Sequence, residues 1–138
     1  MKSGFTGDSR LNEGPYKLTR IETISTGSVN INKIGYSNVE PPKESLLNTG
    51  DILFSNINSL KHIGKTAIYQ VDDHLYHGMN LLRFIPENNS FPLFIYYLLN
   101  TYSKRKWVKE HANQAVNQAS INQTELGNWI VDVPTKDE

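Results

Sequence analysis

The 138-residue chain contains no cysteine. This absence excludes disulfide scaffolds, thiol nucleophiles and cysteine-ligated metals, and it is compatible with the reducing cytoplasm in which we expect the protein to act. The longest apolar run, residues 91–99, includes Pro92 and is far shorter than the roughly 20 residues that span a bilayer. Nor does an apolar stretch follow Lys2, as a signal peptide requires. We therefore expect no membrane association.

A surplus of charge is missing as well, because the formal net charge is +0. A protein that coats nucleic acid through bulk positive charge is therefore not expected. In one segment, however, the cations Lys104, Arg105, Lys106 and Lys109 are accompanied by a single acid, Glu110. Such a local patch can hold phosphates even when the rest of the chain cancels its charge. With 38% hydrophobic and 20% charged residues, the whole chain has the composition of one globular domain with a modest core.

Motifs for catalysis are also absent. The chain has no Gly-x-Ser-x-Gly elbow, no dinucleotide fingerprint, and no Asn/Asp-Pro-Pro-Tyr/Phe tetrapeptide with which amino-methyltransferases hold a flipped base. The triplet at residues 64–66, Gly-Lys-Thr, invites comparison with a phosphate loop. Ser59 stands where such a loop needs glycine, and residues 67–71 have the composition of a strand where a helix should begin. We assign no catalytic residue and expect no cofactor.

Asp72, Asp73, His74 and His77 form the one tight cluster of metal-capable side chains. A small metal-dependent hydrolase or nuclease centred on them is the alternative from a different functional class. However, His-x-x-His suits a helix face, and the neighbouring turn and strand patterns do not supply a helix. We therefore favour a solvated turn with a partly buried histidine, and we expect no metal site.

The pattern of apolar residues predicts an α+β fold with a twisted, largely antiparallel β-sheet and one long helix over about residues 91–113. Strands are expected at residues 16–21, 29–34, 52–55, 65–71, 81–85 and 129–133. Ser90 occupies the position of a helix N-cap, and Pro92 falls within the first turn, where its missing N–H is not needed. Two polar segments, residues 56–63 and 113–123, are expected to be loops.

These two segments are rich in side-chain amides, which can both donate and accept hydrogen bonds. Paired readout of adenine in the major groove uses that geometry. Amides are also common turn residues, and a basic run is often only a solvated helix face. Two amide-rich loops together with a basic patch favour a DNA-binding surface.

One longer pattern runs along the chain. Residues 49–55 (TGDILFS) followed by 63–67 (IGKTA) resemble the "G-D-I-L-(F/I)-(S/A)…(I/V)-G-K-x-A" segment of target recognition domains in the specificity subunits of type I restriction-modification systems. Further landmarks follow in the family's order at residues 3–6, 82–86, 92–99, 120–122 and 130–134. The resemblance covers nearly the whole chain, and its motifs are in register.

The resemblance implies sequence-specific recognition of one half of a bipartite double-stranded DNA site. It also implies that catalysis belongs to partners: adenine methylation from S-adenosylmethionine in modification subunits, and ATP-driven translocation and cleavage in restriction subunits. Family members carry two such domains separated by long helices. This chain has one and stops at residues 134–138, where the first spacer helix would start, so residues 1–138 resemble one excised domain or a fragment of a longer subunit. The recognition domain of a single-chain adenine methyltransferase is the alternative in the same class.

The DNA-binding residues are predicted in three groups, and the isolated domain is expected to be a monomer. Phosphate contacts are expected from Lys61 and Lys65 in the first loop and from the basic run Lys104, Arg105, Lys106 and Lys109. Base edges are expected to be read by Asn56, Asn58 and His62 in the first loop and by Asn117 and Gln118 in the second.

Overall fold

A four-stranded antiparallel sheet lies at the centre of the computed structural model, which describes residues 1–7, 10–87 and 91–128. Its strands, in spatial order, are β1 (Lys2–Ser3), β7 (Leu82–Phe84), β4 (Ile52–Phe54) and β6 (Thr66–Ile68). The predicted strands at residues 52–55, 65–71 and 81–85 are thus confirmed. The predicted strand at 129–133 lies outside the described residues. The predicted N-cap, Ser90, was wrong: the helix that starts at Pro92 has Phe91 as its N-cap, with no side-chain capping hydrogen bond.

The core occupies both faces of this sheet. Successive side chains of a strand point to opposite faces, and in β4 all three residues are buried. Leu53 belongs to one apolar cluster and Phe54 to a second. The first cluster comprises Ile24, Ile34, Leu47, Leu53, Ala67, Tyr69, Leu75 and Leu81. The second comprises Phe54, Ile63, Leu82, Val108, Ala119, Ile121 and Leu126.

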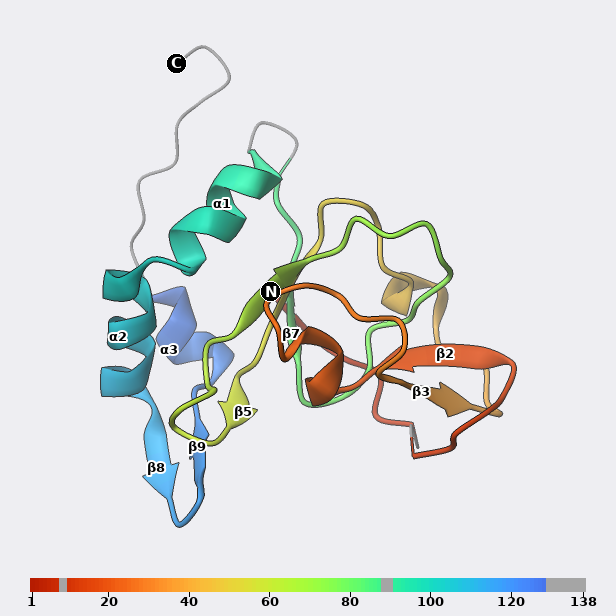
Figure 1. Cartoon of the computed structure of the whole chain (residues 1–138), viewed down its shortest axis with the longest axis horizontal. Helices are drawn as coiled ribbons and strands as arrows, with labels where there is room; N and C mark the ends of the chain where they lie inside the picture. Colours follow the sequence, from red (N-terminus) through yellow and green to blue (C-terminus); the bar gives the residue numbers. More distant parts are fainter. Residues whose placement is uncertain (8–9, 88–90, 129–138) are drawn as a thin grey trace.

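The N-terminal segment covers the first cluster. It consists of β2 (Tyr16–Thr19), the 3₁₀ helix η1 (Ile21–Ile24) and β3 (Ile34–Ser37), and a second 3₁₀ helix, η2 (Lys43–Ser45), follows two prolines. The antiparallel pair β2–β3 lies at one end of the molecule (Figure 1). The strand predicted at 29–34 was misplaced, because it begins only at Ile34. Before it, the Asn30 side chain accepts a hydrogen bond from the Asn32 amide at 2.9 Å, and this local bond favours a turn over a strand.

The single predicted helix is two helices, α1 (Pro92–Leu99) and α2 (Tyr102–His111), which run in different directions (Figure 1). The break is at Asn100 and Thr101. The Asn100 side chain donates to the carbonyl of Tyr96 at 2.7 Å, and the Thr101 hydroxyl donates to that of Leu98 at 2.8 Å. Side chains that bond nearby backbone in this way compete with helix continuation. Thr101 itself has extended backbone angles.

The polar segments predicted as loops contain regular structure. β8 (Asn113–Ala115) and β9 (Gln118–Ser120) form a hairpin, β5 (Ile57–Asn58) pairs with β9, and α3 (Gln123–Gly127) follows. The hairpin projects from the end of the molecule that carries α2 (Figure 1). Its turn contains Asn117 with φ +61°, a left-handed conformation that asparagine tolerates. The α+β class with antiparallel pairing is confirmed, and β5–β9 pairing joins the two amide-rich segments.

Candidate nucleic-acid interface

Amide side chains from distant parts of the sequence meet around one surface hollow, which we call the amide hollow. Its volume is about 380 Å³. The lining residues are Ile21, Ile57, Asn58, Ser59, Asn80, Asn117 and Gln118. The pairing of Asn58 with Ala119 brings β5 beside the hairpin and so creates this proximity. Thus three of the predicted base-reading residues line a single site.

The amides differ in how they are held. Asn117 and Gln118 are exposed on the hairpin. The Asn58 side chain donates to Ser55 Oγ at 3.2 Å and accepts from the Ser59 amide at 2.8 Å, which fixes its orientation. Asn56 lies half-buried: its Nδ2 points to the Ile121 carbonyl at 3.4 Å, and its Oδ1 is buried with no protein partner among the described residues. Asn56 therefore contacts the chain after β9 and does not line the amide hollow.

The first loop packs against α2, and this contact gathers positive charge. A Cβ atom placed on Gly64 would lie 3.2 Å from Val108 and 3.6 Å from Arg105 Nε. The pKa of His62 is lowered mainly by the charge of Lys65, then by burial, and then by the charges of Lys61, Arg105 and Lys109. The structure therefore brings the four cations together around His62. We call Lys61, His62, Lys65, Arg105 and Lys109 the cationic cluster.

The basic run of α2 does not act as one surface. Arg105 and Lys109 are one turn apart and share the side that influences His62. Lys106, about 100° further round the helix, pairs with Glu110 at 3.7 Å, and both side chains are more than half exposed. Lys104 is half-buried. The cationic cluster thus includes two of the four predicted α2 contacts.

Lys65 connects the cationic cluster to the N-terminal segment. Its ammonium group donates to the Ser25 carbonyl at 2.6 Å, at the end of η1. Gly64 has φ +83°, and Thr66 begins β6. The Gly-Lys-Thr triplet is therefore a turn that enters a strand, as predicted, and has no phosphate-loop geometry.

Several residues of the candidate interface were not predicted from the sequence. Asn80 lines the amide hollow and has φ +66°, within a turn before β7. Its position after Gly78 and Met79 indicates a turn, but its proximity to Asn117 arises only from tertiary packing. Ile21 and Ser25 likewise reach the interface because η1 packs beside the first loop.

The metal-dependent hydrolase alternative has no support. The Asp73 carboxylate forms an ion pair with Lys17 at 2.9 Å and accepts from the His74 amide, and the Lys17 hydrogen bond is the main cause of its lowered pKa. His77 is buried; its Nε2–H donates to the Leu81 carbonyl at 2.7 Å, and burial lowers its pKa. Within residues 1–7, 10–87 and 91–128, no three metal-capable side chains gather.

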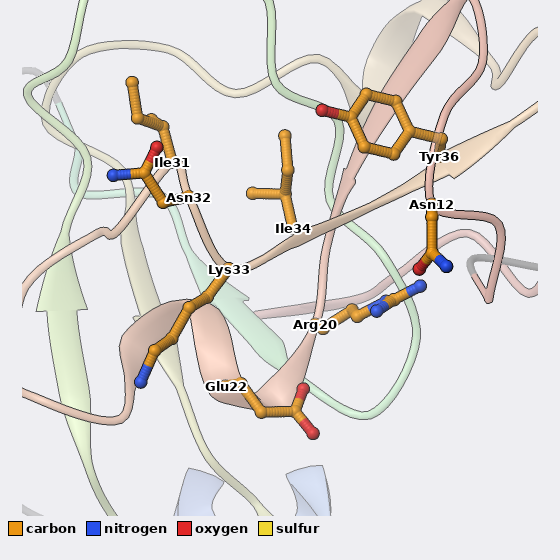
Figure 2. A pocket seen from close by; sticks show the side chains of 8 residues that line it. All are labelled: Asn12, Arg20, Glu22, Ile31, Asn32, Lys33, Ile34 and Tyr36. Carbon is orange, nitrogen blue, oxygen red and sulfur yellow. The ribbon is translucent and has the colours of Figure 1, made fainter.

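A more voluminous hollow, about 620 Å³, lies beside β3 and η1 (Figure 2). It is lined by Asn12, Arg20, Glu22, Ile31, Asn32, Lys33, Ile34 and Tyr36. Figure 2 shows the side chains of Arg20, Glu22 and Lys33 pointing in different directions. Binding sites have polar groups that converge on a ligand. Size alone therefore does not make this hollow the candidate site.

No helix in the described part of the chain has the length and apolar character that crossing a bilayer demands.

Comparison with known proteins gives two findings. Residues 2–138 match the family model described as "Type I restriction modification DNA specificity domain". The chain is also 42% identical, over 145 aligned residues, to a protein of Methanocaldococcus jannaschii described as the type I restriction enzyme MjaX specificity subunit. The alignment covers 100% of this chain but 34% of that relative, so the chain spans about a third of the relative's length.

Proposed function

Because this chain belongs to the family of type I restriction-modification DNA specificity domains, we propose that its amide hollow and cationic cluster together recognise one half of a bipartite DNA site. The observation that carries the proposal is the pairing of β5 with β9, which places amides from both predicted loops around one hollow. The cationic cluster adjoins it through Asn58 and His62, which line the same neighbouring hollow. Groups suited to bases and groups suited to phosphates thus lie side by side.

The two groups have different tasks in this proposal. The major groove admits a two-stranded β-ribbon, and the β8–β9 hairpin projects from the molecule (Figure 1). Asn117 and Gln118 at its turn contact base edges, where an amide can pair with the donor and acceptor of adenine. The cationic cluster contacts phosphates and fixes the register. The full set of proposed DNA contacts is Asn56, Asn58, Lys61, His62, Lys65, Lys104, Arg105, Lys106, Lys109, Asn117 and Gln118.

In this proposal the domain only recognises DNA, and partner subunits carry out the chemical reactions. We infer that modification subunits methylate adenine and that restriction subunits translocate and cleave DNA, in an assembly whose specificity subunit contains this chain as one recognition domain. No residue of the chain is assigned a catalytic role, and the isolated domain is expected to be a cytoplasmic monomer. The chain spans 34% of the length of the M. jannaschii subunit, which leaves room in a subunit of that length for segments that contact these partners.

The proposal is tested by reading which adenines become methylated. In an assembled type I enzyme whose specificity subunit carries this chain, Gln118→Ala should relax or change the bases at one half of the methylated site. The preference of the enzyme for the wild-type base over other bases at that position should fall by about 1–3 kcal/mol. Sequencing of modified bases in a genome exposed to each enzyme provides the measurement.

Gln70→Ala is the matched control, because Gln70 is exposed and lines neither the amide hollow nor the cationic cluster. It should leave the methylated sequence unchanged. An identical methylated sequence and rate for Gln118→Ala and the wild type would show that Gln118 does not read a base.

A further inference from the structure

A further hollow, about 380 Å³ in volume, lies on the α1 side of the cationic cluster. It is lined by Ser25, Thr26, Gly27, Lys65, Thr66, Tyr96, Tyr97, Asn100 and Arg105. Its walls come from four places in the sequence: the end of η1, the start of β6, and both α1 and α2. We call this hollow the socket.

Arg105 gives the socket an uncompensated charge. Its Nε atom is buried and has no hydrogen-bond partner among the described residues. Burial lowers the pKa of the Arg105 guanidinium, and no carboxylate lines the socket in the described part of the chain. Arg105 as a whole is half-buried. A partly desolvated cation with no anion beside it favours the entry of a negative group into the socket.

The other walls are held in place by hydrogen bonds. Lys65 Nζ donates to the Ser25 carbonyl at 2.6 Å, which uses one of the three ammonium protons. The Tyr96 hydroxyl donates to the Gly27 carbonyl at 2.6 Å, and the Asn100 amide donates to the Tyr96 carbonyl at 2.7 Å. Little reorganisation is therefore needed for an anion to enter.

We propose that the socket holds one phosphodiester group of the DNA backbone, with Arg105 and Lys65 as its donors. The inference rests on the proposed function and assigns a position to one phosphate. Arginine presents a planar fork of N–H groups that matches two phosphate oxygens, and lysine adds a point charge.

Continuity with the amide hollow favours a backbone phosphate over a free anion. Lys65 and Ser25 line both the socket and a hollow of about 240 Å³ that also contains Asn58 and His62. Asn58 and Ile21 in turn line the amide hollow. One DNA strand can therefore contact the socket while its neighbouring bases reach the hairpin.

The test compares the salt dependence of DNA binding by the 138-residue chain and its variants. For a 12-base-pair duplex, Arg105→Gln should reduce the slope of log K against log salt by about 0.9, because one phosphate contact releases its counterion. Arg105→Lys keeps the charge and should keep the slope. Lys43→Gln, an equal change of charge in η2, should also leave it unchanged. If Arg105→Gln does not fold, Lys65→Gln should show the same loss.

The backbone amide NMR chemical shifts of Thr26 and Gly27 distinguish a phosphate of the DNA backbone from free inorganic phosphate. The duplex should move both shifts, and inorganic phosphate should compete weakly for the same site. A response to inorganic phosphate but not to the duplex would overturn the assignment to DNA. If the wild type binds the duplex and Arg105→Gln has an unchanged slope, the socket does not hold a DNA phosphate, and the proposed function is not affected. No duplex binding by the wild type at low salt would overturn the proposed function and the socket with it.

Discussion

Arg83 shows how one buried charge holds three segments together. Its Nε donates to the Asp51 carboxylate at 2.8 Å, and its terminal nitrogens donate to the carbonyls of Glu44 at 2.7 Å and Leu46 at 2.9 Å. The Arg83 and Asp51 side chains are 3% and 4% exposed. Asp51 also accepts from the Asn48 amide at 2.7 Å. The ion pair thus joins β7 to the residue before β4, and the hydrogen bonds of its two partners tie residues 44–48 to both.

Removing either partner should destabilise the domain strongly. Arg83→Ala and Asp51→Ala are each expected to lower the free energy of unfolding by roughly 3–5 kcal/mol, because each leaves a buried charge unpaired. Arg83→Lys should restore only part of the loss, since a single ammonium cannot replace the forked contacts to two carbonyls and a carboxylate. Urea unfolding followed by circular dichroism measures the effect. A loss below about 1 kcal/mol for both alanine variants would contradict this role.

If His62 lies against DNA as proposed, it should make DNA binding sensitive to pH. In the free protein the charges of Lys65 and its neighbours lower the His62 pKa. Phosphates that neutralise these cations raise the pKa again, so DNA binding is coupled to proton uptake. Affinity should therefore increase as pH falls from 8 through the pKa of the bound state, and it should level off below the pKa of the free protein.

Titration calorimetry in buffers of different ionisation enthalpy measures the protons taken up. His62→Gln should abolish most of the uptake near pH 6.5, the ordinary histidine pKa. His74→Gln is the matched control, because His74 is exposed and outside the cationic cluster. Equal proton uptake by the His62→Gln variant and the wild type would show that His62 is not part of the DNA-binding surface.

At the level of elements, local patterns predicted the central strands and missed the hairpin. Residues 52–55 and 65–71 were identified because apolar, β-branched side chains dominate them. The β8–β9 hairpin has few such residues, and β8 is exposed at every position. It is stabilised by pairing with β5 and by the burial of Ala119, which are long-range contacts that sequence patterns do not carry. The helix break was missed because Asn100 and Thr101 each tolerate a helix interior at only modest cost.

Asn117 combines a backbone task with the proposed reading task, and two substitutions separate them. Asn117→Gly keeps the left-handed turn because glycine adopts positive φ freely, so stability should change by less than about 0.5 kcal/mol. Asn117→Ala imposes that conformation on a residue that avoids it and should cost about 1–2 kcal/mol. Thermal unfolding distinguishes the two variants.

If the Asn117 amide reads a base, both variants should lose the same base discrimination in the assembled enzyme. The control is Val116→Ala, at the neighbouring position of the turn. Val116 is 91% exposed, and its side chain carries no amide group. Loss of discrimination in Asn117→Ala alone would mean that the turn's shape, and not the amide, determines specificity.

For the molecule as a whole, the net charge gives no sign of the proposed binding surface. The chain sums to +0, yet the fold gathers Lys61, Lys65, Arg105 and Lys109 around His62. The sequence identified the basic run and the first loop separately, and it supplied most of the proposed contacts. It did not show that they adjoin, nor that Ser25, Thr26 and Asn80 line the hollows beside them. Those facts depend on how η1 and the turn before β7 pack, which is set by contacts between distant residues.

The lone chain should bind DNA weakly, with little preference for sequence and a steep dependence on salt. Half a site offers few base contacts, so most of the affinity comes from phosphates, and a Kd on the order of 10 µM at physiological salt is expected. Arg105 and Lys65 share one phosphate in the socket, so the four cations of the cationic cluster contact three phosphates and predict a slope of log K against log salt of about −2.7. Contacts from Lys104 and Lys106 would extend the slope to about −4.5. Fluorescence anisotropy on cognate and scrambled duplexes between 50 and 200 mM salt measures both quantities. A slope shallower than about −2, or nanomolar binding that strongly favours one sequence, would show that bases and not phosphates dominate the contact.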